Sequence, residues 1–211
     1  MRIGVVSDTH DRHEAIAEVV RLLLEQDIEL LLHCGDIESP ETVRIFKPIP
    51  THFVFGNWDK DKAKLTAAIK DMGGTHYDSF GAIELGGKRI AWVHSHERHQ
   101  LRQLENADFF DYVFYGHTHV REQHRTGKTL VANPGALFRA NPKTCIVLDL
   151  ETGEIKPLIV PVAPRVSANG TPHASAGDEG TGSILGPFEP LRRNNTDPST
   201  DPPPEAAAPP G

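Results

Sequence analysis

The stretch RIGVVSDTHDRHEAIAEVVRLLLEQDIELLLHCGD, residues 2–36, decides the fold class. It opens with a short apolar run that ends at Asp8 and closes with a second one that ends at Asp36. Between the two runs, apolar residues recur at intervals of three and four, which predicts an amphipathic helix. Its apolar face comprises Ile16, Val19, Val20, Leu23 and Leu24. A strand–helix–strand unit of this kind predicts a right-handed crossover and a parallel sheet.

The same alternation continues to residue 74, and the second half of the chain is richer in strands. A third strand is predicted at 51–57, and the remaining segments are predicted as helices at 40–46, 60–74 and 98–107, a strand at 111–119, and hairpins at 80–96, 121–135 and 143–160. Gly86 and Gly87 mark the turn of the first hairpin. Together these elements predict an α/β fold, an αββα-type sandwich of two mixed β-sheets flanked by helices.

Composition divides the chain near residue 162. Of the 17 prolines, 10 lie in 163–211, whereas only one of the 14 aromatic residues does. Such a segment buries too little apolar surface to offset its ordering entropy. We therefore expect one domain at 1–162 and a Pro/Gly-rich disordered tail at 163–211. The only apolar island in that tail, SILGPFEPL at 183–191, is expected to be unstructured as well.

Charge and cysteine content limit the classes of function. The formal net charge is −7, which argues against binding nucleic acid through a basic surface. Two cysteines, Cys34 and Cys145, provide no disulfide framework, although a single bridge is left open. Asp8 interrupts the first apolar run early, and no segment reaches the ~18 apolar residues of a spanning helix. We expect a cytoplasmic protein without a membrane partner.

Ligand-type side chains follow the predicted strands, at the point where each strand ends. They are Asp8 and His10, Asp36, Asn57, His94 and His96, and His117 and His119. The carboxyl edge of an open α/β sheet is where ligands bind. Carboxylate, amide oxygen and imidazole together suit Mn²⁺, Fe²⁺ or Zn²⁺. The number of donors exceeds one ion and favours two ions that share a carboxylate.

Each of these motifs alone has an ordinary explanation. Asp8 would serve equally well as a helix cap, and Gly-Asp is common turn chemistry. Their coincidence at successive strand ends, with Gly35, Gly56 and Gly116 directly before ligand positions, favours a metal site. A residue without Cβ lets neighbouring groups approach an ion closely.

The order D-x-H, G-D, G-N, H-x-H and G-H-T-H resembles the calcineurin-like metallophosphoesterase superfamily. The length and the G-N-x-D form of the third motif resemble its small bacterial and archaeal phosphodiesterase branch. The resemblance covers residues 1 to about 161, and NPGA at 133–136 matches a further family motif.

The resemblance implies two divalent metal ions and a set of ligands for each. The first ion would be held by Asp8, His10 and His119, the second by Asn57, His94 and His117, and Asp36 would bridge them. A metal-bridging hydroxide would hydrolyse the P–O bond of a small-molecule phosphoester, most simply a phosphodiester. Manganese is the expected metal, with nickel, iron, zinc and magnesium as alternatives.

Two positions depart from the family pattern. Ser95 stands where glycine is usual, and its hydroxyl is expected to tighten the loop or to enter the site. Trp58 and Asp59 follow Asn57, where larger members have a histidine that assists the leaving group. His96 is our candidate for that catalytic role, and a hydrogen-bond partner of a metal ligand is the alternative. Trp58 is expected either to stack on a substrate ring or to pack against its loop. Three arginines that follow the last ligands are expected at the surface, with contact to a phosphate as the alternative: Arg121, Arg125 and Arg139.

Two other functions are compatible with the sequence. A phosphomonoesterase or nucleotide pyrophosphatase would use the same site with different pocket walls. A retromer-subunit-like scaffold would keep the fold with an altered metal site, but here all seven ligand positions carry competent donors. A homo-oligomer is also left open.

Overall fold

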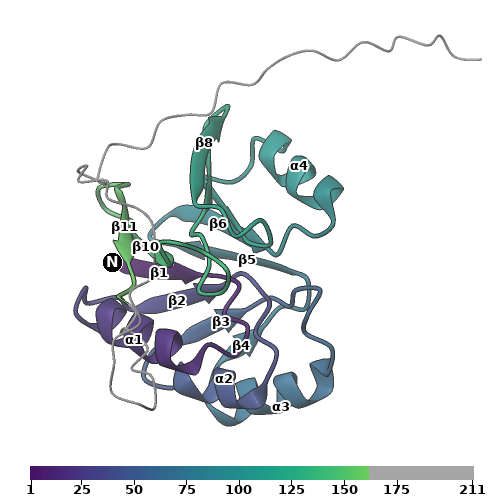
Figure 1. Ribbon diagram of the computed structural model, residues 1–211. Coiled ribbons are helices and arrows are strands. Elements are labelled where there is room, and N and C mark those ends of the chain that lie inside the picture. Colours follow the sequence, from purple (N-terminus) through teal and green to yellow (C-terminus); the bar gives the residue numbers. More distant parts are fainter. Residues whose placement is uncertain (162–211) are drawn as a thin grey trace, which may run out of the picture.

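The computed structural model of the protein describes residues 1–161, which form two stacked β-sheets with helices on both outer faces (Figure 1). The first sheet has the strand order β11-β10-β1-β2-β3-β4. Its strands are β1 (Arg2–Val6), β2 (Leu30–His33), β3 (Thr51–Phe53), β4 (Thr75–His76), β10 (Thr144–Asp149) and β11 (Ile155–Ile159). Strands β1 to β4 pair in parallel, whereas β10 is antiparallel to both of its neighbours.

The second sheet is also mixed, with the order β5-β6-β7-β9-β8. Its strands are β5 (Phe80–Leu85), β6 (Lys88–Val93), β7 (Tyr112–Tyr115), β8 (Glu122–Thr126) and β9 (Thr129–Asn133). Strands β6, β7 and β9 pair in parallel, and a hairpin closes each edge. Gly86 and Gly87 both have positive φ, which is the two-residue hairpin turn predicted from the sequence.

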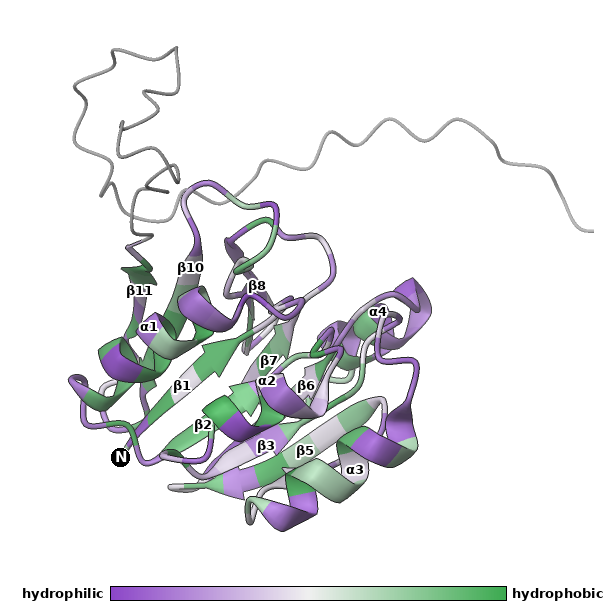
Figure 2. Cartoon of the chain, turned by 60° about the horizontal axis from the view of Figure 1, so that its bottom comes forward, coloured by the Kyte–Doolittle hydropathy of each residue, from purple (hydrophilic) through white to green (hydrophobic). Residues whose placement is uncertain are grey.

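Helices cover the outer faces of the two sheets. They are α1 (His13–Leu24), α2 (Pro40–Ile45), α3 (Lys62–Asp71) and α4 (Arg98–Asn106). One apolar core joins α1, α2 and α3 to the first sheet, a second core lies between the sheets around Trp92 and Phe114, and a third joins α4 to the second sheet. In Figure 2 strands β1 and β2 are mostly green and white, whereas α1 and α3 carry both purple and green residues. The arrangement is an αββα sandwich.

The predicted fold class is confirmed, and two details of the prediction are wrong. Leu24 is 46% exposed because α1 ends there, at the edge of its apolar face. The two-residue strand β4 was not predicted, since Thr75 and His76 are both exposed and show no apolar pattern. Cys34 and Cys145 are buried free thiols. The division at residue 162 and the segment 183–191 stay predictions, because they lie outside the described residues.

Within residues 1–161, none of the four helices combines the length and the apolar character needed to cross a lipid bilayer.

Candidate metal centre

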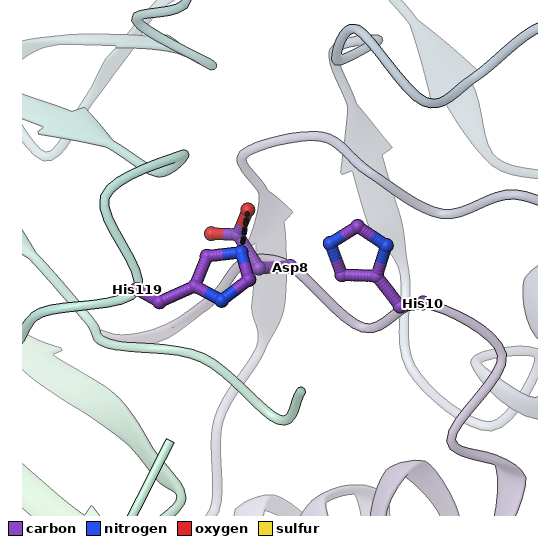
Figure 3. A group of neighbouring side chains, drawn as sticks. All are labelled: Asp8, His10 and His119. Atoms are coloured by element: carbon purple, nitrogen blue, oxygen red, sulfur yellow. Dashed lines mark ion pairs between the residues drawn. The ribbon is translucent and has the colours of Figure 1, made fainter. Parts of the chain in front are cut away.

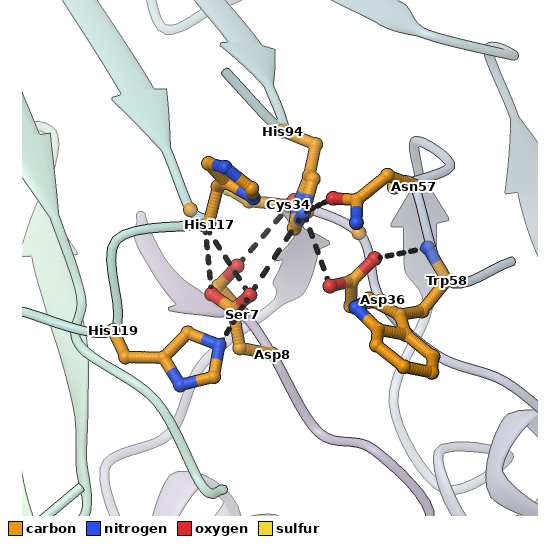
Figure 4. Close-up of polar contacts among 12 residues, drawn as sticks. Ser7, Asp8, Cys34, Asp36, Asn57, Trp58, His94, His117 and His119 are labelled. Atoms are coloured by element: carbon orange, nitrogen blue, oxygen red, sulfur yellow. Dashed lines mark hydrogen bonds and ion pairs between the residues drawn. The ribbon is translucent and has the colours of Figure 1, made fainter. Parts of the chain in front are cut away.

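The predicted ligands gather where the two sheets meet. Strands β1, β2 and β3 are parallel neighbours in the first sheet, and β6 and β7 are parallel neighbours in the second, so their carboxyl ends lie at shared edges. The loops after these five strands meet in one polar centre (Figure 4). A side chain from each loop therefore reaches the same place.

Three fully buried side chains, Asp8, Asp36 and His94, form what we call the inner group. His94 Nε2 lies 3.2 Å from Asp36 Oδ2 and 3.9 Å from Asp8 Oδ1. Asn57 Oδ1 lies 3.0 Å from the same nitrogen. Two carboxylates, one amide oxygen and one imidazole nitrogen thus converge, which is the donor set expected of a divalent cation site.

His10 and His119 extend this centre on the side of Asp8 (Figure 3). His119 Nε2 lies 3.2 Å from Asp8 Oδ1, and His10 Nε2 lies 3.4 Å from Asp36 Oδ2. Single atoms of Asp8, His10 and His119 lie within 4.8 Å of one another, and so do atoms of Asp8, Asp36 and His94. Both carboxylates therefore stand between two histidines.

Two of the histidines are oriented so that a lone pair faces the carboxylates. His10 Nδ1 donates to Glu38 Oε1 at 2.6 Å, and His94 Nδ1 donates to the carbonyl of Cys34 at 2.8 Å. These acceptors fix the proton of each neutral ring on Nδ1 and leave Nε2 as an acceptor. His10 Nε2 is buried and has no hydrogen-bond partner. A lone pair aimed at anionic oxygens is unfavourable without a cation between them, so these residues fit a metal ion.

Backbone N–H groups hold the two carboxylates in place. The N–H of His117 donates to both oxygens of Asp8, at 3.2 and 3.0 Å. The N–H of Trp58 donates to Asp36 Oδ1 at 2.9 Å. Since a backbone donor cannot rotate away, both carboxylates are oriented before any ligand arrives.

Asp59 ties together two of the loops that carry ligands. Its buried carboxylate accepts four backbone N–H bonds of 2.7 to 3.0 Å, from Asp36, Ile37, Glu38 and Gly56. Burial raises the pKa of Asp59, and the N–H groups of Glu38, Gly56 and Ile37 only partly offset that effect. The loops after β2 and β3 are thus joined through one side chain.

Much of the centre has a left-handed backbone, which is uncommon for residues other than glycine. Asp8, His10, Asp36, His117 and His119 all have φ between 41° and 74°. Such conformations persist only where the surroundings enforce them, and they concentrate at functional sites. This feature is not visible in the sequence.

Glycine is required at two positions for close approach. A Cβ at Gly56 would lie 2.1 Å from Asp36 Oδ1, and a Cβ at Gly116 would lie 1.8 Å from the hydroxyl of Ser7. The expected role of glycines beside the ligands agrees with these distances.

Three exposed side chains, Trp58, His96 and His117, form what we call the rim of the centre. The ring centroid of His117 lies 5.1 Å from that of His94 and 6.4 Å from that of His96. The indole of Trp58 is 56% exposed, with its centroid 6.0 Å from that of His10. Packing against its own loop therefore does not bury Trp58.

Ser95 explains why glycine is common at its position. Its φ is 71°, a conformation that glycine adopts without strain. The hydroxyl donates to the carbonyl of Gly116 at 2.9 Å. It links the loops after β6 and β7, in agreement with the expected tightening.

Asn133 of the NPGA motif holds the loop after β7 through hydrogen bonds. Its buried side chain donates to the carbonyl of Gly116 and to Thr118 Oγ1, and its Oδ1 accepts from the N–H of Gly135. Leu137, just beyond the motif, donates its N–H to the carbonyl of Asp8. The motif thus positions two ligand-bearing loops.

The charges of the centre shift the pKa values of its members. Burial lowers the pKa of His94, but the hydrogen bond to Asp36 and the charge of Asp8 outweigh it, so the net shift is upward. The hydrogen bond to Asp8 raises the pKa of His119. For Asp36, burial is outweighed by His94 and by the N–H of Trp58, and the pKa falls. Both histidines thus attract a cation or a proton.

Sequence reasoning missed Glu38 and the role of Asp59. Neither residue was a candidate metal ligand. Glu38 accepts from His10 Nδ1 and Asp59 accepts from four backbone N–H groups, and neither kind of contact produces a recognisable spacing in the sequence. Their nearness to G-D and G-N motifs was the only available signal.

The fold and this centre define an α/β sandwich with a polar site, rich in histidine and carboxylate, at the carboxyl edge of both sheets. The chain belongs to the calcineurin-like phosphoesterase superfamily, whose domain model matches residues 1–153. The resemblance seen in the sequence is thereby confirmed.

Several proteins similar to this chain carry names of the same class. Phosphodiesterase MJ0936 of Methanocaldococcus jannaschii is 28% identical over 76% of this chain and 99% of its own length. A probable metallophosphoesterase of Methanothermobacter thermautotrophicus is 30% identical over 64% of this chain and 77% of its own length. The solved structure of an archaeal phosphodiesterase covers 75% of this chain and 99% of that chain, with 29% identity and a TM-score of 0.71.

The superfamily implies divalent metal ions. Vps29 of Entamoeba histolytica, solved in complex with Zn²⁺, covers 75% of this chain and 97% of that chain. It is 23% identical with a TM-score of 0.54, a likeness that concerns the fold alone.

Proposed function

We propose that this chain is a metal-dependent phosphodiesterase that hydrolyses a small-molecule phosphodiester. The observation that carries the proposal is the convergence of the inner group, His10 and His119 with imidazole lone pairs facing carboxylates. The similarity to an archaeal phosphodiesterase over 99% of its length supports the diester as substrate.

Seven residues would hold two divalent cations. Asp8, His10 and His119 would bind one ion, Asn57, His94 and His117 the other, and Asp36 would contact both. The bridging role of Asp36 is supported by Oδ2, which lies 3.4 Å from His10 Nε2 and 3.2 Å from His94 Nε2. We propose manganese as the metal, with nickel, iron, zinc or magnesium as alternatives. When bound, such ions lower the pKa of water and offset charge on phosphoryl oxygens.

The chain's own residues supply orientation. Glu38 and the Cys34 carbonyl hold the rings of His10 and His94, and the N–H groups of His117 and Trp58 hold the carboxylates. Because these contacts exist before substrate binds, the phosphorus enters a site that needs little rearrangement.

His96 is proposed to give a proton from its ring to the leaving oxygen. It is exposed on the rim, with its centroid 5.6 Å from that of His94, so a substrate at the inner group would lie within its reach. Its position beside the donors, not among them, supports this role.

A panel of substrates and metals tests the proposal. Bis(p-nitrophenyl) phosphate and p-nitrophenyl phosphate would be compared with Mn²⁺, Mg²⁺, Ni²⁺ and Zn²⁺, after chelation of any metal present. We expect faster turnover of the diester, loss of activity on chelation and recovery with Mn²⁺. Two equivalents of bound metal without turnover of any phosphoester would instead support a scaffold. A cytoplasmic location and a homo-oligomer stay predictions from the sequence.

A further inference from the structure

A cavity opens beside the metal centre, on the side of His119. Its volume is about 350 Å³, and its walls include His119, Val120, Arg121, Arg139, Asn141 and Ile159. Val120 and Ile159 are 58% and 43% exposed, so they present apolar surface to a ligand. One wall is therefore apolar and another is cationic, and the volume is near the lower end of small-molecule sites.

Arg139 connects this cavity to the centre. Its guanidinium carbon lies 4.9 Å from the ring centroid of Phe138, and that ring lies 4.6 Å from the ring of His10. Arg12 lies over the same ring at 4.5 Å. The guanidinium groups of Arg12 and Arg139 thus both contact the ring of Phe138, which lies next to the proposed metal ligand His10.

The two guanidinium groups of this stack have no acidic partner within residues 1–161. No carboxylate in residues 1–161 forms an ion pair with Arg12 or Arg139, whereas Arg2 and Arg44 each have one and Arg21 has two. Arg139 also has φ of 47°, so its backbone is held in an uncommon conformation. An exposed guanidinium that stacks on Phe138, lines a cavity and has no carboxylate partner within residues 1–161 suits an anionic oxygen of a ligand.

We propose that this cavity binds the second ester group of the phosphodiester, the group that stays on phosphorus, and that Arg139 recognises a phosphate carried by that group. The substrate class is then a diester of a phosphorylated nucleoside-sized alcohol. This inference rests on the proposed function. It is consistent with His96, which lies against His94 and His117, because the leaving group and the second group would occupy different sides of the centre.

Two substrates that differ only in the second group test the inference. Thymidine 5′-(p-nitrophenyl phosphate) and its 3′-phosphorylated form both release p-nitrophenolate when water adds to phosphorus. The products are thymidine 5′-monophosphate and thymidine 3′,5′-bisphosphate. We expect the wild-type protein to prefer the 3′-phosphorylated substrate, and Arg139→Gln to lower kcat/KM for that substrate about tenfold through KM. The other substrate should change less than about twofold.

Two further variants make the result specific. Arg139→Lys keeps the charge without the planar fork and should recover part of the preference. Arg102→Gln removes an arginine on α4 that belongs to neither the stack nor the cavity lining, and kcat/KM for both substrates should stay unchanged. Equal loss on both substrates in Arg139→Gln, or no wild-type preference, would overturn the inference while leaving the phosphodiesterase proposal intact. Hydrolysis of neither substrate, with no diester turned over, would instead overturn the proposed function.

Inhibition by the two products provides a second readout. Thymidine 3′,5′-bisphosphate should inhibit the wild-type protein more strongly than thymidine 5′-monophosphate. Arg139→Gln should remove that difference, and an unchanged difference would contradict the inference.

Discussion

The inner group and the rim of the metal centre are held in different ways. Asp8, Asp36 and His94 are buried, and each is fixed by a backbone N–H or C=O. Trp58, His96 and His117 are exposed and lie beside other rings. The difference teaches that the buried ligands proposed for the metal are preorganised, whereas the proposed ligand His117 and its neighbours Trp58 and His96 are exposed at the edge of the site.

The largest expected effect tests the inner group. Asp36→Ala removes the carboxylate that faces both His10 and His94, so hydrolysis of bis(p-nitrophenyl) phosphate with Mn²⁺ should fall more than about 10⁴-fold, beyond the range of acid–base help. Activity assays and metal analysis of the purified variant would measure this. The exposed Asp71→Ala, at the end of α3, is the matched control. Activity near wild type in Asp36→Ala would refute the bridging role.

The next effect tests the rim. His96→Ala should keep its metal content while kcat falls about 10²–10⁴-fold, because only proton transfer to the leaving group is lost. Steady-state kinetics and metal analysis separate the two quantities. Loss of metal from this variant would mean that His96 is itself a metal ligand or supports one, and not a proton donor alone. The exposed His99→Ala, three residues further along the chain in α4, is the control and should change neither quantity.

A smaller effect concerns the support of His10. Glu38→Ala removes the acceptor that fixes the ring proton on Nδ1, and metal affinity should weaken about 10–100-fold. Competition with a chelating dye would give the dissociation constants. Glu41→Ala, on the exposed face of α2, is the control, and an equal loss in both variants would contradict the positioning role of Glu38.

The smallest effect concerns His33, which is buried behind the inner group. Burial lowers the pKa of His33 to about 3, while the charges of Asp8 and Asp36 oppose that shift and those of His94 and His10 add to it. The unfolded chain takes up a proton below pH 6.5 and the folded chain does not, so the free energy of unfolding falls as the pH falls from 6.5 towards 3. The expected contribution is about 1 kcal/mol per pH unit.

His33→Gln isolates that contribution. Urea unfolding of the wild-type protein and the variant between pH 6.5 and 5.5 would compare their slopes, because all other titrating groups are shared. The variant should lose about 1 kcal/mol less over this interval. Identical slopes would show that His33 takes up its proton in the folded state too.

Most of the fold and of the candidate ligands could be predicted from two sequence features, the residues at strand ends and the apolar faces of helices. The apolar run before Asp8 and the 3–4 spacing after it depend on local chemistry, and both appear in β1 and α1. Glu38 and Asp59 could not be recognised, because their contacts join loops that are about 20 residues or more apart. The left-handed backbone at His10 and His117 persists only where the surrounding structure enforces it, so no local sequence pattern indicates it.

The junction of the two sheets has a consequence for biosynthesis. The contact of His94 with Cys34 spans 60 residues, and that of His117 with Asp8 spans 109. On the ribosome, the first strands can begin to pair before His94 and His119 are translated, so until then Asp8 lacks both of its histidine neighbours and Asp36 has only His10. A nascent chain that ends before His119 therefore carries an incomplete polar centre, which is completed only when the loops after β6 and β7 reach those of the first sheet.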